Sequence, residues 1–200
     1  STAGIPIAVS KLVAEHMATR NYRAAHRVFR VAFIILLIFG SFFSLLLFFG
    51  AGYISELVKD PRAYYPLLSL APAIFIVAVM SSFRGFFQGR QQMLPTALSQ
   101  IAEQVGRVVS ALVLSFLLLP RGLEYGAAGA TFGASFGALM SLLVLLYIYF
   151  SRRKYFAREM KIYRNGQEAT QAFSTILYRI FTLSLPITFG SLAMPLMNLL

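Results

Sequence analysis

The sequence contains no cysteine and no tryptophan, and it has only two histidines. Without cysteine it can form neither disulfides nor thiolate metal sites, and it has no thiol nucleophile. Charged residues are also scarce, at 12% against about 25% in soluble domains. Hydrophobic residues make up 58% of the 200 residues, so a soluble fold could not cover its surface with polar groups. The composition excludes a soluble enzyme, a disordered chain and a nucleic-acid-binding protein, and it indicates an integral membrane protein.

Long uncharged segments predict membrane-spanning helices. A bilayer core of about 30 Å is crossed by roughly 20 helical residues, and three segments without any charge exceed that length: 31–53, 63–83 and 125–151. A fourth segment, 94–119, is interrupted only by Glu103 and Arg107. Shorter apolar stretches at 1–17 and 180–200 predict parts of two further helices. Because both ends lie in apolar stretches, we expect the chain to be an internal part of a longer protein.

The net charge of +11 is unevenly distributed between the predicted spans. Basic residues concentrate in three connecting regions: 20–30, 84–90 and 152–164. The regions between them, 54–62 and 120–124, carry as many acidic as basic residues. Cytoplasmic loops of membrane proteins collect Lys and Arg. The alternation therefore predicts that the first, third and fifth connecting regions are cytoplasmic.

A polar stripe runs along the fourth segment. Its residues follow one another at steps of four and three, which places them on one face of a helix; they are Thr96, Gln100, Glu103, Arg107 and Ser110. Ionisable groups at membrane depth are expensive, so this face should meet protein or water rather than lipid. Glu103 and Arg107 are also spaced for an ion pair within one helix. The stripe indicates either a cavity lining or a structural ion pair.

Small residues repeat every four positions in the segment 125–151. Gly129, Gly133 and Gly137 form one row, and such rows let helices approach closely in lipid, where no hydrophobic force drives their association. We therefore expect this row to pack against a neighbouring helix. The sequence shows no cluster of His, Asp or Glu of the kind that metal binding or acid–base catalysis needs. A metal site, a cofactor and an enzymatic activity are not expected.

Three stretches of the sequence carry a resemblance to a known family: GIPIAVSKLVAE at 4–15, SFRGFFQG at 82–89 and PTALSQIAEQVGR at 95–107. With them the sequence resembles the polysaccharide-transporter branch of the multidrug/oligosaccharidyl-lipid/polysaccharide exporter superfamily. Within this branch it is most similar to the stage V sporulation protein B-like proteins, which are related to lipid II flippases. A fourth stretch, LSLPIT at 183–188, resembles the start of the second half of these proteins.

The resemblance implies an all-α integral membrane transporter of about 12–14 helices, with two lobes around a central cavity. Residues 1–171 would form most of the first lobe, from the end of its second helix to its sixth, with a cytoplasmic inter-lobe loop at 151–171. Residues 172–200 would begin the second lobe with a truncated seventh helix. Members of the family reside in the bacterial cytoplasmic membrane. They move lipid-linked cell-wall precursors or oligosaccharides across it by alternating access.

The leading hypothesis is a flippase whose substrate is lipid II or another undecaprenyl-linked saccharide. Lys11, Arg84 and Arg107 would offer positive charge to the pyrophosphate headgroup, because a guanidinium donates two parallel hydrogen bonds to phosphate. Gln100 and Glu103 complete the candidate cavity residues, with Glu103 holding Arg107. The partners implied are the lipid-linked saccharide and membrane lipids, with no nucleic acid.

Two alternatives remain open at this point. One is a cation-coupled multidrug exporter of the same fold, for which Glu103 would be the coupling carboxylate. The other is a membrane scaffold without transport activity, which would recruit cell-wall synthesis enzymes through its basic connecting regions.

The charge alternation makes a topological prediction. The substitution Asn165→Cys should resist impermeant thiol reagents added to intact cells, because residues 152–164 are expected on the cytoplasmic side. Arg121→Cys, in a connecting region expected on the opposite side, should be labelled. Rapid labelling at residue 165 together with protection at residue 121 would invert the topology.

Overall fold

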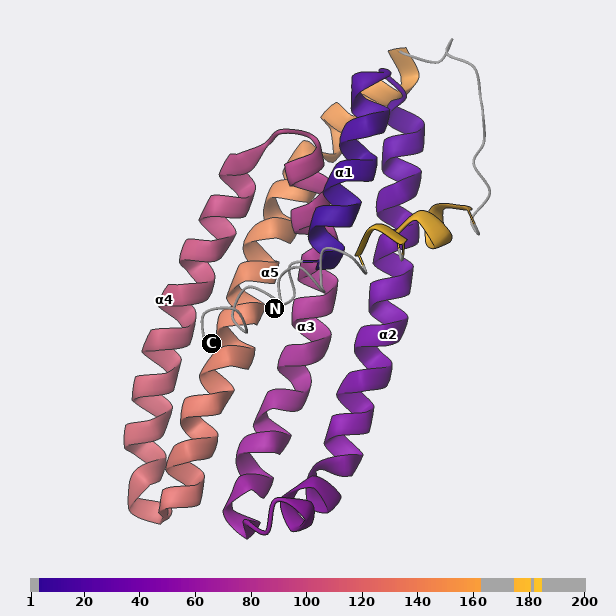
Figure 1. Ribbon diagram of the computed structural model, residues 1–200. Helices are drawn as coiled ribbons and strands as arrows, with labels where there is room; N and C mark the ends of the chain where they lie inside the picture. Colours follow the sequence, from indigo (N-terminus) through magenta and orange to yellow (C-terminus); the bar gives the residue numbers. More distant parts are fainter. Residues whose placement is uncertain (1–3, 163–174, 181, 185–200) are drawn as a thin grey trace, which may run out of the picture. The chain divides into compact units, whose positions relative to one another are not determined.

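The computed structural model describes residues 4–162, 175–180 and 182–184 (Figure 1). Its elements, in chain order, are α1 (Gly4–Ala18), α2 (Tyr22–Leu57), the 3₁₀ turn η1 (Pro61–Ala63), α3 (Tyr64–Gly89), α4 (Met93–Leu118), the 3₁₀ turn η2 (Leu119–Arg121) and α5 (Leu123–Ile162). Residues 175–180 and 182–184 are also helical. The described residues contain no strand, and the predicted all-α class is confirmed.

Four of these helices are long and apolar enough to cross a membrane: α2, α3, α4 and α5. Each corresponds to one of the four complete segments predicted from the sequence, although α3 and α4 each leave out one terminal residue of theirs. Lipid offers no partner for backbone N–H and C=O groups, and a helix satisfies these groups within the segment itself. Many large apolar side chains on these helices are exposed, Phe49 and Phe116 among them, as expected for surfaces that face lipid. Most of the predicted helix at 180–200 lies outside the described residues.

The helices extend beyond the apolar segments into regions that were expected to be loops. Arg23, Arg27 and Arg30 lie on α2, and α5 continues through the basic residues that follow Ser151 to Ile162 (Figure 1). Arg and Lys have high helix propensity and can extend their charged ends away from apolar surroundings. A helix therefore does not have to begin or end where its apolar segment does, and charge alone placed the start of α2 too late and the end of α5 too early.

Three connections are tight turns that end helices without glycine. Arg20, Lys59 and Gln91 adopt positive φ angles of 54°, 57° and 58°. In each turn the following residue donates its N–H to a carbonyl five residues back, as Asn21 does to His16 at 2.8 Å and Gln92 does to Phe87 at 2.9 Å. This is the Schellman arrangement, in which glycine is the usual left-handed residue. The connecting regions are therefore shorter than the sequence suggested.

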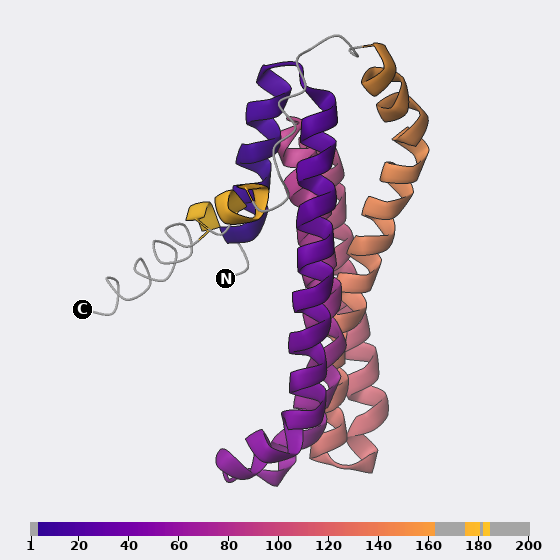
Figure 2. The same ribbon diagram turned by 90° about the vertical axis from the view of Figure 1, so that its right-hand side faces the viewer.

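One compact unit comprises α1, α2 up to Leu36, residues 81–96, the end of α5 from Tyr147, and residues 175–180 and 182–184. In this unit α1 lies beside the first turns of α2 (Figure 2) and packs closely on α3. A Cβ added to Gly85 would lie 2.9 Å from the Pro6 carbonyl oxygen, and one added to Gly89 would lie 2.6 Å from that of Ser10. These two glycines let the backbones of α1 and α3 touch. The largest fully buried side chains of the unit include Leu12, Val28, Phe86 and Phe87.

The second unit comprises residues 37–80 and 97–146. Within it α5 packs on α4 through the glycine row predicted from the sequence. An added Cβ would lie 2.7 Å from the Leu114 carbonyl carbon at Gly129, 2.8 Å from the Arg107 carbonyl oxygen at Gly133, and 2.6 Å from the Glu103 carbonyl oxygen at Gly137. Real Cβ atoms essentially never come this close to backbone atoms, so all three positions require glycine.

Serine hydroxyls join helices of the second unit. Ser44 of α2 donates a hydrogen bond of 2.7 Å to the carbonyl oxygen of Ala71 on α3. Ser135 of α5 donates one of 2.7 Å to the carbonyl oxygen of Ser69, also on α3. Interhelical hydrogen bonds of this kind stabilise membrane helix bundles by about 0.6 kcal/mol each. They supplement the close contacts that the small residues allow.

The glycine row on α5 predicts a large effect of one substitution. Gly133→Leu should destabilise the fold by at least about 1–3 kcal/mol, because the side chain must push α4 away. Detergent-extracted protein should show less monodisperse material and a lower Tm. Gly52→Leu is the matched control in the same unit, since nothing lies within 4 Å of a Cβ added there. An unchanged Tm for Gly133→Leu, or an equal decrease of Tm in both variants, would show that the glycine row does not pack against α4.

Candidate functional site

The polar stripe on α4 contains an ion pair within a helix that is long and apolar enough to cross a membrane. A guanidinium nitrogen of Arg107 lies 2.6 Å from a carboxylate oxygen of Glu103, one helical turn away. The Glu103 side chain is 10% exposed and that of Arg107 is 42% exposed. The carboxylate is thus enclosed by protein, while part of the guanidinium reaches the surface of the described residues. Glu103 fixes the direction in which the Arg107 side chain points.

The same turn of α4 forms the contact with α5. A Cβ added to Gly137 would lie 2.9 Å from both the Cβ and the backbone nitrogen of Arg107. The close approach of the two helices therefore shields one side of the ion pair, and it leaves Nε of Arg107 buried without a hydrogen-bond partner among the described residues. Ser110, the next member of the stripe, is buried and donates to the carbonyl oxygen of Gly106. The same turn of α4 therefore carries both the ion pair and the contact with α5.

The other candidate residues lie on three helices. Gln100 is exposed on α4, Lys11 is exposed on α1, and Arg84 is half-buried on α3. Lys11 and Arg84 belong to the first compact unit, whereas the α4 residues belong to the second. The structure brings Glu103 and Arg107 together. That all five residues meet one headgroup stays a prediction.

Lys11 lies on a face of α1 that a later segment approaches. The contact of α1 with α3 uses Val9 and Val13, whereas Glu15, one turn after Lys11, lies 3.6 Å from Arg179 in an ion pair. Residues four apart share a helix face. Because both side chains of this pair are about half exposed, it contributes little to stability. It does show that the segment 175–180 lies next to the Lys11 face of α1.

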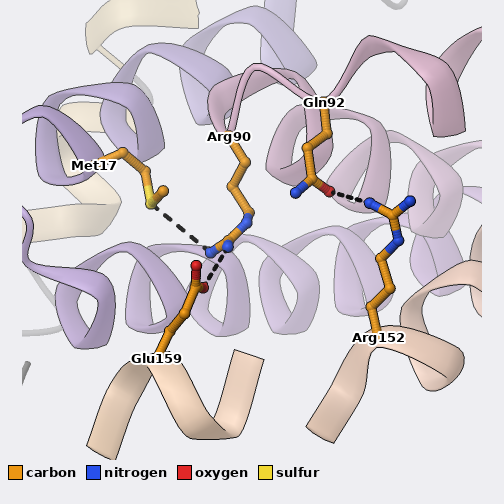
Figure 3. Close-up of polar contacts among 5 residues, drawn as sticks. All are labelled: Met17, Arg90, Gln92, Arg152 and Glu159. Carbon is orange, nitrogen blue, oxygen red and sulfur yellow. Dashed lines mark hydrogen bonds and ion pairs between the residues drawn. The ribbon is translucent and has the colours of Figure 1, made fainter. Parts of the chain in front are cut away.

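A second buried ion pair was not anticipated from the sequence. Arg90, just after α3, lies 2.5 Å from Glu159 of α5, and their side chains are only 5% and 17% exposed (Figure 3). The Arg90 guanidinium also lies 4.5 Å from the centre of the Phe156 ring and 3.8 Å from the sulfur of Met17. The sequence interpretation had placed Arg90 and Glu159 in two separate loops. The single signal was that Glu159 is the one acidic residue within 152–164.

A neighbouring hydrogen bond ties the start of α4 to α5. Arg152 donates to the side-chain oxygen of Gln92 at 3.1 Å, beside the Arg90 ion pair (Figure 3). The short turn between α3 and α4 is therefore held on α5 at two points. Within the first unit these contacts join the ends of α1, α3 and α5 and the first residues before α4.

The described residues of this site can bind a ligand through charge and hydrogen bonds. Among residues 4–162, 175–180 and 182–184, no group of three or more His, Asp or Glu residues is placed to hold a metal ion. The Arg107 guanidinium, held on one side by a carboxylate and partly exposed on the other, can donate hydrogen bonds to an anion. Arginine in such a position is suited to phosphate.

Over residues 1–200 the sequence matches the family of polysaccharide biosynthesis proteins. The chain belongs to this family. The match extends along the whole sequence, so it covers both compact units and the residues that follow them. The resemblance stated from the three sequence stretches is thereby confirmed.

Curated relatives of this polysaccharide biosynthesis family member occur in Bacillus subtilis (strain 168). Stage V sporulation protein B is 36% identical over 181 residues, which cover 87% of this chain and 34% of the relative. Lipid II flippase MurJ is 32% identical over 209 residues, which cover 99% of this chain and 38% of the relative. The uncharacterized membrane protein YabM is 33% identical over 156 residues, which cover 77% and 29%.

The chain spans about a third of the length of these relatives. No solved structure matches it. The four apolar spanning helices and the membrane relatives together show that this family member is a multi-pass bacterial membrane protein.

The buried pair of Arg90 and Glu159 predicts an asymmetric mutational effect. Glu159→Ala should destabilise the protein by about 3 kcal/mol, because it leaves a buried guanidinium without its counter-ion. The double variant Arg90→Met/Glu159→Leu should recover part of this loss, since it buries no charge.

The measurement is the Tm of detergent-purified protein for each variant. Arg158→Ala is the matched control, because Arg158 is exposed on the same turn of α5, and it should change stability by less than about 0.5 kcal/mol. Equal Tm values for Glu159→Ala and Arg158→Ala would show that the pair does not hold α5 to α3.

Proposed function

We propose that the full-length protein is a flippase that moves a lipid-linked saccharide precursor across the bacterial cytoplasmic membrane by alternating access. The observation that carries this proposal is the arginine on α4. Arg107 lies within a membrane-spanning helix, is oriented by the enclosed Glu103, and remains partly exposed. An ionisable residue retained at membrane depth marks a functional site by default.

The relatives support the class of substrate. This chain aligns along nearly its whole length with a protein named as a lipid II flippase and with stage V sporulation protein B. Lipid II is a polyprenyl pyrophosphate that carries a saccharide. A substrate of this kind needs cationic hydrogen-bond donors for its headgroup, and Arg107 is such a donor at membrane depth.

The proposed division of labour follows from the geometry of α4. Glu103 accepts from one terminal guanidinium nitrogen and Nε is buried, so the remaining terminal N–H groups would donate to a phosphate oxygen. Gln100 presents an exposed amide on the same stripe and would hydrogen-bond the saccharide. Lys11 and Arg84, which belong to the first compact unit, would each offer further positive charge to the headgroup. The polyprenyl tail would remain in lipid while the headgroup crosses.

A cation-coupled multidrug exporter is the alternative that Glu103 suggests, because it is a carboxylate enclosed within a span. Its ion pair with Arg107 at 2.6 Å weighs against that role, since a coupling carboxylate would have to exchange this partner for a proton or a metal cation. The pair is better suited to orienting the guanidinium.

A mutant cycle tests the headgroup role of Arg107. Arg107→Gln in the full-length protein should lower flipping of fluorescent lipid II in vesicles by about tenfold or more, because a charged hydrogen bond contributes about 1.5–3 kcal/mol. Rates are normalised to folded protein. The loss leaves Glu103 unpaired, so this variant should also be less stable. Adding Glu103→Gln should then restore stability but not flipping.

Arg121→Gln is the control for removing one arginine, since Arg121 is exposed in η2 at the end of the same span. It should flip at the wild-type rate. If the double variant flipped lipid II at the wild-type rate, Arg107 and Glu103 would have a structural role only. Absence of flipping by the wild type, with cell-wall enzymes retained on the protein, would support the scaffold alternative instead.

A further inference from the structure

The exposed surface of α4 has a polar row of residues beside an apolar one. Gln100, Gln104 and Arg107 follow one another at steps of four and three, so they share one face of the helix. Both glutamines are exposed, and the Arg107 side chain is 42% exposed. Gln104 was not among the candidate residues predicted from the sequence. The apolar row beside it consists of residues that are 55–64% exposed: Ile101, Val105, Val108 and Leu112.

The polar residues of α4 therefore divide into a buried side and an exposed side. Thr96, Glu103 and Ser110 are buried, and Gly137 of α5 packs against the carbonyl oxygen of Glu103 on this side. The exposed polar row lies on the adjacent side of the helix. An amide or a guanidinium that faced hydrocarbon would lack hydrogen-bond partners, which is unfavourable. The row therefore has to meet a polar partner or water rather than lipid tails.

The Arg107 guanidinium leans toward the end of α4 that begins at Met93. Side chains on a helix point toward its N-terminus, and the 2.6 Å contact with Glu103, one turn earlier, holds the guanidinium in this direction. The positive charge therefore lies about one turn nearer to Met93 than the Arg107 backbone does. This is the height of Gln104 on the helix.

Beyond Arg107 the same face of α4 becomes apolar. Continued at steps of four, three and four, it carries Ala111, Leu114 and Leu118, and Ser115 is the one polar residue between 111 and 118. Counted from Met93, the face therefore carries first amides over about 6 Å, then a cation, and then apolar groups. Lipid II has its parts in the same order, with a saccharide, a pyrophosphate and a polyprenyl chain.

We propose that this face of α4 binds a lipid-linked saccharide in one orientation. The saccharide lies on Gln100 and Gln104, the pyrophosphate on Arg107, and the start of the polyprenyl chain on Leu114 and Leu118. Gln104 is then a second saccharide-binding residue, because a side-chain amide both donates to and accepts from sugar hydroxyl groups. The inference rests on the proposed function and adds to it which part of the substrate each turn of α4 binds.

The order along α4 matches the substrate before transport. The connecting region 84–90, which precedes α4, is expected on the cytoplasmic side because it is basic. In a lipid of the inner leaflet the saccharide points to the cytoplasm and the polyprenyl chain points to the centre of the membrane. The face of α4 has its amides and its apolar groups in this same arrangement, so it suits a substrate that has not yet crossed.

Two ligands separate the saccharide contacts from the pyrophosphate contact: lipid II, and undecaprenyl pyrophosphate, which has no saccharide. The Kd of each is measured by native mass spectrometry of full-length protein in detergent. Gln100→Leu/Gln104→Leu should weaken lipid II binding about tenfold, because two neutral hydrogen bonds are lost, and should leave the Kd of undecaprenyl pyrophosphate unchanged. Arg107→Gln/Glu103→Gln should weaken both ligands by the same factor. Gln100→Asn/Gln104→Asn keeps the amides on shorter side chains, so its Kd for lipid II should fall between those of the wild type and the leucine variant.

Ile101→Ala/Val105→Ala is the matched control, because it changes two exposed residues of the adjacent apolar row. It should bind both ligands as the wild type does. If the leucine variant bound lipid II with the wild-type Kd, as it would if another helix of the full-length protein covered the row, the saccharide assignment would be wrong. Equal weakening of both ligands by the leucine variant would also overturn it, and in either case the proposed function would stand. A wild type that binds neither ligand would refute the proposed function and this inference together.

The orientation has a test of its own with two photoreactive analogues of lipid II. An analogue with the reactive group on the polyprenyl chain, close to the pyrophosphate, should label residues 111–118. One with the group on the saccharide should label residues 97–104, and both are mapped by mass spectrometry of the labelled peptides. Labelling of residues 97–104 by the polyprenyl analogue, or no labelling of α4 by either analogue, would overturn the proposed orientation.

Discussion

Close contact between helix backbones is the constraint on which this structure depends. In lipid no hydrophobic force draws apolar helices together, so they associate where small residues let them touch. Two sets of glycines allow this contact. One is the pair Gly85 and Gly89, where α3 meets α1, and the other is the row Gly129, Gly133 and Gly137, where α5 meets α4. Each approach is too close for any other residue, and serine hydroxyls add directional links between α2, α3 and α5.

The packing of α5 on α4 also fixes the position of the candidate site formed by Glu103 and Arg107. Gly137 lies against the turn of α4 that carries Glu103 and Arg107, so the position of the guanidinium is set by a contact that the neighbouring helix makes with the backbone. Helix packing explains why a charged pair can persist in a span, since α5 shields one side of it. The other side remains open, and that openness distinguishes a site from a mere buried ion pair.

The features predictable from the sequence were those with a local period. Uncharged length identified the four spans, a spacing of four paired Glu103 with Arg107, and the same spacing exposed the row from Gly129 to Gly137. Gly85 and Gly89 show that spacing too and could have been recognised. The pair of Arg90 and Glu159 could not, because its partners are 69 residues apart and only the fold brings them together. The turns at Arg20, Lys59 and Gln91 lack the glycine that would have marked them, so the sequence suggested longer loops.

The length of α5 has a consequence for where its polar end lies. Its 40 residues measure about 60 Å at 1.5 Å per residue, roughly twice the hydrocarbon thickness of a bilayer. The part beyond Ser151 extends the helix by about 16 Å past its uncharged segment. Glu159 on this part pairs with Arg90 at the end of α3, so within the first compact unit the polar ends of the two helices are fixed to each other.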